Sequence, residues 1–161
     1  MLIIIFLIIF LPLLIVSILI IVVLDGFPAV IKQTRVGLHG KNFEMFKLRT
    51  MKKNSHLERE DLQELNEQSG PLFKIENDPR IIKGTKFLRR FSLDEIPQLI
   101  NVIKGEMSLV GPRPLFPEDN SYFDEHYLRR LNVLPGITGL LQINDRNTCL
   151  LYTSPSPRDM P

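Results

Sequence analysis

The most informative part of the sequence is FLRRFSLDEIPQLINVIKGEMSLVGPRP, residues 87–114. It sets two carboxylates side by side, Asp94 and Glu95, with arginines both upstream and downstream of them. The isoleucines and leucines that follow recur at helical spacing, and Gly105 then supplies a residue that commonly ends a helix. We therefore predict a helix over residues 95–104, with both carboxylates at its start.

The start of this helix has two interpretations. Ser92 followed by Glu95 matches a capping box, but Pro97 would then lie too far inside the helix. Asp94 as the cap places Pro97 in the first turn, where its missing N–H costs little. Under both interpretations the two carboxylates lie at a helix N-terminus, where free N–H groups and the helix dipole favour anions.

These residues have the side chains that phosphoryl chemistry needs. An aspartate can attack phosphorus directly, and adjacent carboxylates can hold Mg²⁺ together with the phosphates of a substrate. Arginine binds phosphate oxygens through paired N–H groups, and Arg113 is presented between two prolines that restrict its backbone. The alternative is structural, because acidic pairs commonly cap helices and nearby arginines form surface ion pairs worth under about 1 kcal/mol. Local spacing leaves both interpretations open.

The first 24 residues, MLIIIFLIIFLPLLIVSILIIVVL, contain no charged residue, although the chain has 20 basic and 18 acidic residues. About 20 apolar residues cross the hydrocarbon core of a bilayer, so this run predicts a membrane segment. Pro12 predicts a kink or a break. The helix either spans the bilayer, which the sequence alone slightly favours, or re-enters the same face. The basic residues that follow place the remaining chain on the cytoplasmic side and attract anionic membrane lipids.

The rest of the chain predicts a small mixed domain. Residues Val30–Val36 and Phe43–Arg49 alternate apolar and polar side chains around a glycine-containing turn, which predicts a β-hairpin. Four further elements are expected from periodicity and turn signals: a polar helix over residues 56–68, a helical turn before Ser92, a helix over residues 119–132 and a strand over residues 137–144.

Composition argues against several other classes of function. A single cysteine, Cys149, rules out an intrachain disulfide, and the three histidines do not cluster as zinc ligands would. The net charge of +2 and the lack of a recognition motif argue against a nucleic-acid partner. These patterns do not determine the oligomeric state, so a homo-oligomer remains open.

Four segments together resemble a known family. They are QTRVGLHGKNFEMFKLRTM at residues 33–51, NDPRI at residues 77–81, the opening stretch at residues 87–114, and LPGITGLLQINDRN at residues 134–147. With the apolar start they are similar to the monotopic bacterial sugar transferases. The chain looks like the small polyprenyl-phosphate phosphoglycosyl transferases, which carry only the catalytic domain. The stretch at residues 87–114 is the longest and most specific of the four.

The resemblance implies an α+β fold in two parts. Residues 1–24 would form a re-entrant membrane helix broken at Pro12, with both ends on the cytoplasmic face, which reverses the slight preference for spanning. Residues 25–148 would form a small, mostly helical catalytic domain with a short β-hairpin. The protein would then lie in the bacterial inner membrane with its catalytic domain on the cytoplasmic face.

The resemblance also implies a reaction. Family members transfer a phospho-sugar from a UDP-sugar to polyprenyl (undecaprenyl) phosphate, which starts cell-surface glycans such as exopolysaccharide or lipopolysaccharide. Asp94 matches the family nucleophile, which attacks the β-phosphate, releases UMP and holds a covalent phospho-sugar. Glu95 matches the second acidic residue, associated with Mg²⁺, so both carboxylates are candidate metal ligands. The arginines at matching basic positions are candidate phosphate-binding residues: Arg89, Arg113, Arg80 and Arg146.

Several features depart from the family pattern. Leu11 stands where the family often has serine, and Asp145 stands where glycine is common. Residues 149–161, CLLYTSPSPRDMP, match nothing expected there, which predicts a non-native tail on a chain truncated at its C-terminus. Truncation raises an alternative function, a catalytically inactive membrane-bound scaffold of a polysaccharide assembly complex. The intact pair of Asp94 and Glu95 argues against that alternative.

Overall fold

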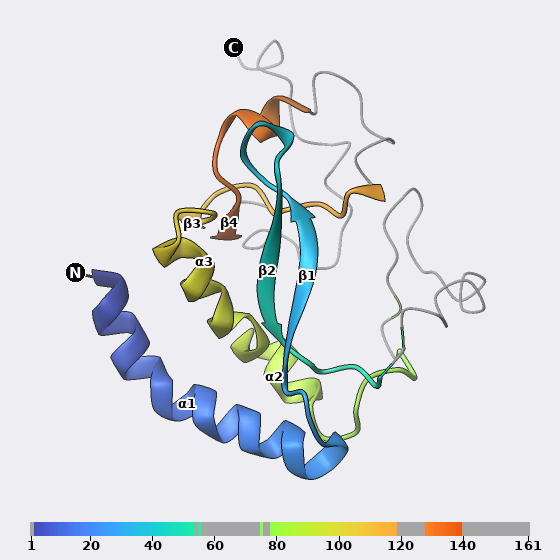
Figure 1. The fold of residues 1–161 in the computed structure, drawn as a ribbon. Coiled ribbons are helices and arrows are strands. Elements are labelled where there is room, and N and C mark those ends of the chain that lie inside the picture. The colour runs from blue at the N-terminus through green and yellow to red at the C-terminus, as the bar shows by residue number, and fades with distance from the viewer. Residues whose placement is uncertain (1, 54, 56–74, 76–77, 119–127, 140–161) are drawn as a thin grey trace, which may run out of the picture.

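The computed structural model describes residues 2–53, 55, 75, 78–118 and 128–139 of the 161-residue chain, and of residues 2–9 it describes the helical backbone alone. The described residues combine helices and strands, which confirms the α+β prediction. In chain order the elements are α1 (Leu2–Asp25), β1 (Val30–Val36), η1 (Leu38–Gly40), β2 (Asn42–Leu48), α2 (Lys86–Arg90), η4 (Leu93–Gln98), α3 (Leu99–Ile103), β3 (Ser108–Val110), η6 (Arg129–Asn132) and β4 (Gly136–Thr138), where η denotes a 3₁₀ helix (Figure 1).

Helix α1 is a single bent helix. Pro12 lies inside α1 without ending it, and the ribbon of this helix bends along its length (Figure 1). A proline inside a helix removes one backbone hydrogen bond and commonly kinks it. The predicted break is therefore a bend, and the re-entrant placement in a bilayer stays a prediction. In the part of the chain whose side chains are described, no helix has both the length and the apolar content to cross a membrane.

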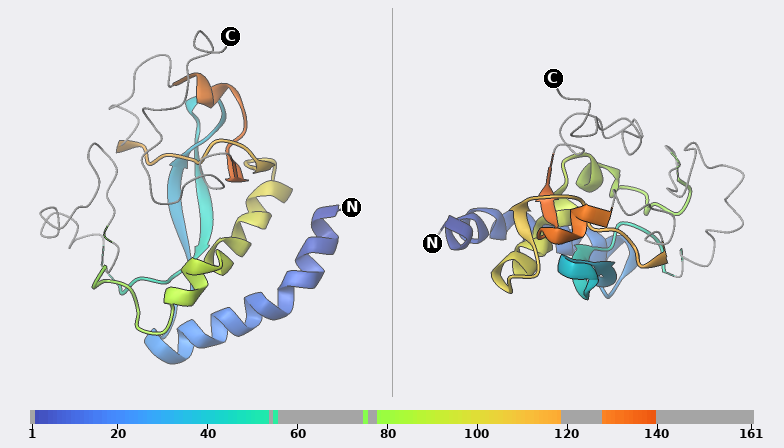
Figure 2. Two further views of the ribbon diagram at one scale, coloured as in Figure 1. Left: turned by 180° about the vertical axis from the view of Figure 1, so that it is seen from behind. Right: turned by 90° about the horizontal axis from the view of Figure 1, so that it is seen from above.

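The apolar core joins α1 to the rest of the molecule. Ile21, Ala29, Leu48 and Leu88 are buried in one cluster, so α1, β2 and α2 share it. Helices η4 and α3 lie between α1 and the β-hairpin, as the views in Figures 1 and 2 agree. Fully burying an aliphatic side chain is worth about 1.5–3 kcal/mol, so removing α1 would expose part of the core.

Arg49 attaches the end of α1 to the hairpin. Its buried side chain forms an ion pair with Asp25 and donates hydrogen bonds to the backbone carbonyls of Asp25 and Gly26. It also donates to the Pro28 carbonyl, at 2.7 Å. The last carbonyls of a helix have no intrahelical donor, and a cation there interacts favourably with the helix dipole. This contact fixes where α1 ends relative to β2.

The predicted β-hairpin is confirmed, and β2 begins and ends one residue earlier than predicted. Strands β1 and β2 pair antiparallel from Val30 opposite Leu48 to Val36 opposite Asn42. The connection includes Gly40 with a φ of +75°, a conformation that glycine adopts at no steric cost. The hairpin packs its β2 side against η4, which brings a strand next to the acidic pair.

The predicted helix over residues 95–104 is present, but its first part is the 3₁₀ helix η4. Ser92 occupies the N-cap position with a left-handed backbone (φ 56°), and its side chain makes no capping hydrogen bond. The first turn is closed instead by the Glu95 N–H, which donates to the Ser92 carbonyl at 3.1 Å. Pro97 lies inside η4. The structure thus starts the helix at Ser92, without the predicted side-chain cap.

Helix α3 ends at Ile103, and the predicted terminating glycine, Gly105, follows its C-cap residue Lys104. Gly105 has a φ of +75°, and its N–H donates to the Val102 carbonyl at 3.0 Å. The next N–H, of Glu106, donates to the Asn101 carbonyl at 2.9 Å. These two bonds form a Schellman motif, which satisfies the last carbonyls of the helix.

Asn101 connects α3 to β2. It is fully buried, and its side-chain amide donates to the Glu44 carbonyl at 2.7 Å. Its side-chain oxygen accepts the Phe46 N–H at 3.0 Å. The amide thus makes the pair of hydrogen bonds that a neighbouring strand would make to β2, which sets the position of the strand along the helix.

A second, shorter sheet pairs β3 with β4 in parallel. A Cβ on Gly136 would lie 2.0 Å from the Gly111 nitrogen, so only glycine allows the two backbones to approach. Strand β4 is the first part of the strand predicted over residues 137–144. The rest of that strand lies outside the described residues, as do the predicted helix 56–68 and all but the end of the predicted helix 119–132.

Candidate active site

The Asp94 carboxylate is buried at the start of the helix and meets a lysine from the hairpin. Asp94 is 3% exposed in η4. The Nζ atom of Lys47, from β2, lies 3.0 Å from Asp94 Oδ2. Burying a carboxylate without a partner is costly, so the ammonium group is what makes this position tolerable. The predicted nucleophile is therefore held at a defined position by a long-range ion pair.

Glu95 shares the same lysine. Lys47 Nζ lies 3.5 Å from Glu95 Oε1, and Arg113 Nη1 lies 3.5 Å from the same oxygen. The side chain of Arg113 is 49% exposed, whereas those of Lys47 and Glu95 are 18% and 15% exposed. The site thus grades from a buried carboxylate to an arginine that solvent can reach.

Sequence reasoning missed Lys47, which it counted only among the basic residues after the apolar start. Alternate residues of a strand share one face, and Lys47 therefore shares its face with Met45, which is 3% exposed. A lysine on the buried face of a predicted hairpin was the signal that could have identified it. The structure brings Lys47 together with Asp94, Glu95 and Arg113.

Arg80 belongs to a separate buried pair. Its Nε lies 2.9 Å from Asp78 Oδ1 and its Nη2 lies 2.6 Å from Asp78 Oδ2, while Nη1 donates to the Ser55 carbonyl at 3.1 Å. Burial raises the pKa of Asp78, but the hydrogen bonds and charge of Arg80, with a contribution from Arg89, hold it below its ordinary value. The predicted phosphate-binding role of Arg80 would require this pair to open.

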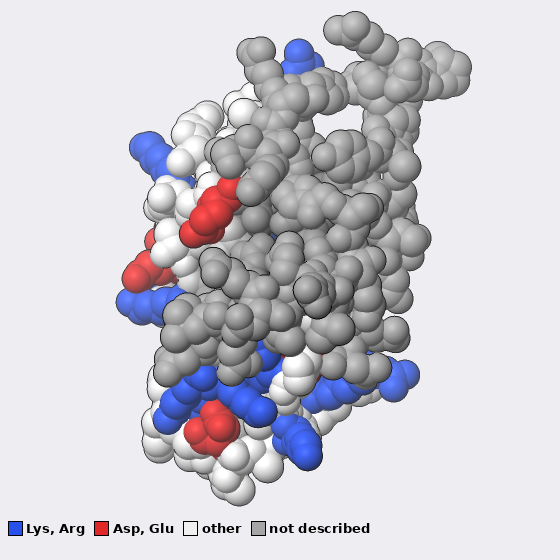
Figure 3. All heavy atoms as spheres, turned by 90° about the vertical axis from the view of Figure 1, so that its right-hand side faces the viewer, with Lys and Arg blue, Asp and Glu red and all other residues white. Residues whose placement is uncertain are grey.

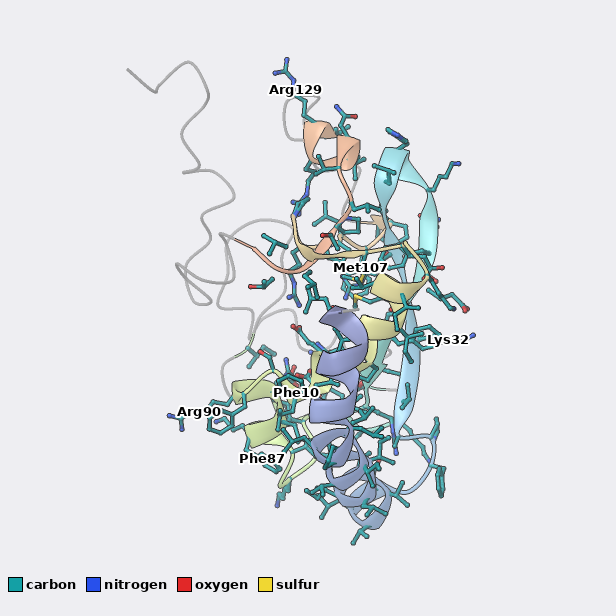
Figure 4. The ribbon with its side chains drawn as sticks, turned by 90° about the vertical axis from the view of Figure 1, so that its left-hand side faces the viewer. Phe10, Lys32, Phe87, Arg90, Met107 and Arg129 are labelled. Carbon is teal, nitrogen blue, oxygen red and sulfur yellow. The ribbon has the colours of Figure 1, made fainter. Side chains whose placement is uncertain are left out.

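Arg89 lies on the exposed side of α2. It is one of four exposed basic residues in or beside this helix: Lys83, Lys86, Arg89 and Arg90. Lys and Arg side chains gather at the end of the molecule that carries α2, at the bottom of Figure 3. Arg90 projects from α2 away from the core (Figure 4). This surface can attract an anion, and the specific role of Arg89 stays a prediction. Arg146 lies outside the described residues.

The acidic pair fits a hard divalent cation. Carboxylate oxygens are the ligands that Mg²⁺ prefers, and it usually combines one or two of them with waters and substrate phosphates. Asp94 Oδ2 and Glu95 Oε1 already share one cationic group, the Lys47 ammonium. Among the described residues no cluster of three or more acidic, histidine or cysteine side chains offers a complete metal cage. Asp94 and Glu95 would therefore hold the metal together with ligands from substrate.

Comparison with known proteins identifies the family. A family model described as bacterial sugar transferase matches residues 1–156, and the chain belongs to this family. The galactosyl transferase CpsE of Streptococcus agalactiae serotype III (strain NEM316) is 46% identical over 123 residues, which cover 76% of this chain and 27% of that protein.

The names of two further relatives include a lipid phosphate, undecaprenyl phosphate. The undecaprenyl-phosphate galactose phosphotransferase of Salmonella typhimurium is 44% identical over 131 residues, covering 76% of this chain and 27% of that protein. The UDP-glucose:undecaprenyl-phosphate glucose-1-phosphate transferase of Escherichia coli (strain K12) is 42% identical over 120 residues, covering 73% and 24%. Across the curated relatives compared, the matched part is 23% to 56% of their length.

Proposed function

We propose that the protein transfers a phospho-sugar from a UDP-sugar to a polyprenyl phosphate, such as undecaprenyl phosphate, through a covalent intermediate on Asp94. The observation that carries this proposal is the buried Asp94 carboxylate, held by Lys47 beside Glu95. The names of two relatives support it, because they combine undecaprenyl phosphate with galactose or glucose. The product would start the synthesis of a cell-surface glycan.

In the first step, a carboxylate oxygen of Asp94 attacks the β-phosphorus of the UDP-sugar. A bond forms between this oxygen and phosphorus, the bond from phosphorus to the bridging oxygen breaks, and UMP leaves with the electron pair. Lys47 holds Oδ2 at 3.0 Å, so we assign the attack to Oδ1. We assign Arg113 to the phosphate oxygens of the donor, because arginine pairs with such oxygens through several N–H groups.

In the second step, an oxygen of the polyprenyl phosphate attacks the phosphorus of the adduct. The bond to Asp94 breaks, the carboxylate is restored, and the polyprenyl diphosphate sugar leaves. Two displacements on one carboxylate replace a single difficult transfer. Mg²⁺ held by Asp94 and Glu95 would offset the charge of the phosphate oxygens. Arg89, on the exposed side of α2, is our candidate for the acceptor phosphate.

The acceptor is a lipid, and we place the reaction at the cytoplasmic face of the bacterial inner membrane. Apolar side chains that water can reach support this placement. On α1 they are Leu11, Leu13, Ile15, Val16, Leu19, Val23 and Leu24, and near the site they are Phe87, Phe91, Ile100 and Ile103. Phe87 projects from α2 beside Arg90 (Figure 4). A surface that binds at the headgroup region of a bilayer combines apolar side chains with cations in this way.

Intact-mass spectrometry tests this proposal. The chain in nanodiscs, with Mg²⁺ and a panel of UDP-sugars, should gain the mass of one phospho-sugar and release UMP, and Asp94→Asn should do neither. The added mass identifies the sugar class. Asp25→Asn is the matched control, because Asp25 also forms an ion pair, with Arg49, but lies at the end of α1. A folded wild-type chain that gains no mass with any donor would refute the proposal and favour the inactive scaffold.

A further inference from the structure

The loop that carries Arg113 is held by other parts of the chain. At one end of residues 112–115, the Pro112 carbonyl accepts the Gly136 N–H at 2.9 Å. At the other end, the Leu115 carbonyl accepts the Val36 N–H at 2.9 Å. Strand β4 therefore holds the Pro112 end of the loop, and strand β1 holds the Leu115 end.

Two arginine side chains hold the middle of the loop. Arg130, from η6, donates from Nη2 to the backbone carbonyl of Arg113. Arg35, from β1, donates from Nη1 to the Pro114 carbonyl at 3.3 Å. All four consecutive carbonyls of residues 112–115 thus accept a hydrogen bond from outside the loop.

The loop needs this external support because of its own sequence. Pro112 and Pro114 have no N–H, so every second residue lacks the donor with which loops normally hydrogen-bond to neighbouring segments. Proline restricts φ but leaves the direction of the whole loop undetermined. The direction in which the Arg113 side chain leaves the backbone is therefore set by the groups that hold its carbonyl and the next one.

Arg35 is built into this position. It is 8% exposed, its guanidinium lies 3.3 Å from the centre of the Phe116 ring, and Nη2 donates to Gln33 Oε1 at 3.1 Å. A planar guanidinium can stack on a ring and donate in its plane at the same time, which a lysine ammonium cannot do. Strand β1 thus contacts the loop through a side chain as well as through the Val36 N–H.

We propose that Arg35 and Arg130 are positioning residues that act through Arg113. They orient the loop so that Arg113 Nη1 lies 3.5 Å from Glu95 Oε1 and faces the phosphates of the donor. This inference rests on the proposed function, because it assigns a purpose to the position of Arg113. Neither arginine needs to touch substrate for this role.

A double-mutant cycle tests the proposal. Arg35→Met and Arg130→Ala should each raise the KM for the UDP-sugar about tenfold or more, as a displaced catalytic group does. In an Arg113→Ala background, each should cause less than about a twofold further change, since they act through the residue already removed. Arg35→Lys should not restore the KM. Arg129→Ala, an exposed neighbour of Arg130, is the matched control and should change nothing.

Hydrogen exchange over residues 111–118 separates this inference from the proposed function. Exchange should accelerate in Arg35→Met and in Arg130→Ala and stay unchanged in Arg129→Ala, whether or not the chain transfers a phospho-sugar. An inactive wild type would refute the proposed function alone. Losses that add to that of Arg113→Ala, or unchanged exchange in both variants, would overturn the positioning role. If Arg35→Met does not fold, Arg130→Ala decides the question by the same two measurements.

Discussion

Two buried aspartates of this chain meet cations in different ways. Asp78 is bound by Arg80, two residues away, through both carboxylate oxygens. Asp94 is bound by Lys47 from another element, and among the described residues its ion pair involves Oδ2 alone. Lys47 also serves Glu95, so one ammonium group is divided between two carboxylates.

The number of carboxylate oxygens that a cation occupies separates a structural carboxylate from one that can react. A bidentate arginine uses both oxygens of Asp78, so nothing remains for a ligand, and the lowered pKa of Asp78 is the consequence. Among the described residues, the lysine at Asp94 contacts one carboxylate oxygen, Oδ2. We therefore expect changes at the first pair to lower stability and changes at the second to lower activity.

Arg80→Ala should have the largest effect on stability. Removing one partner of a buried ion pair leaves the other charge uncompensated and costs about 3–5 kcal/mol. Thermal unfolding in nanodiscs measures the loss, with Arg129→Ala as the exposed arginine control, expected within about 0.5 kcal/mol of wild type. A raised KM for UDP-sugar at unchanged stability would instead support the phosphate-binding role first assigned to Arg80.

Lys47→Met should have the largest effect on activity. The variant removes the ammonium group that Asp94 and Glu95 share, so turnover should fall roughly 10²–10³-fold, comparable with losing one charge-stabilising donor. Lys32→Met is the matched control, because Lys32 lies on the same hairpin in an exposed pair with Glu44. The rate of UMP release measures turnover in both variants. Equal losses in the two variants would mean that Lys47 contributes only general charge.

Asn101→Ala should have the third-largest effect, on both stability and turnover. It would leave the partly buried N–H of Phe46 and the carbonyl of Glu44 without the Asn101 amide, and a buried polar group that loses its partner costs about 1–3 kcal/mol. Because this amide sets β2 against α3, turnover should also fall through the displaced Lys47. Asn132→Ala, at an exposed asparagine, serves as the control. A variant of unchanged stability would show that water replaces the amide.

The smallest expected effect is the change in stability with pH that Asp78 causes. The pKa of Asp78 is lowered in the folded state, so this group adds stability above its unfolded pKa of about 4 and loses it as pH falls through the folded value. The stability gap between wild type and Asp78→Asn should stay constant from about pH 7 to pH 5 and shrink below about pH 4. Denaturation midpoints across this range measure it. A gap that changes between pH 6 and pH 8 would contradict the assignment.

Much of the fold could be predicted from local pattern. Alternation predicted the hairpin to within one residue, and Gly105 marked the end of α3 through its left-handed conformation. The start of the same helix was harder, because a 3₁₀ turn around Pro97 replaced the expected cap. Alternative capping arrangements have similar free energies at a helix end. We infer that the contact of η4 with β2 selects between them.

Periodicity and side-chain chemistry within a short window predicted the elements near the acidic pair. The resemblance of longer segments to the sugar transferases gave the family and pointed to Asp94 and Glu95 as candidate site residues. Which cation meets which carboxylate is seen in the folded structure. Arg80 pairs with Asp78, two residues away, whereas Lys47 reaches Asp94 from a distant strand. The second pairing depends on how β2 packs against η4, and no local spacing in the chain encodes that packing.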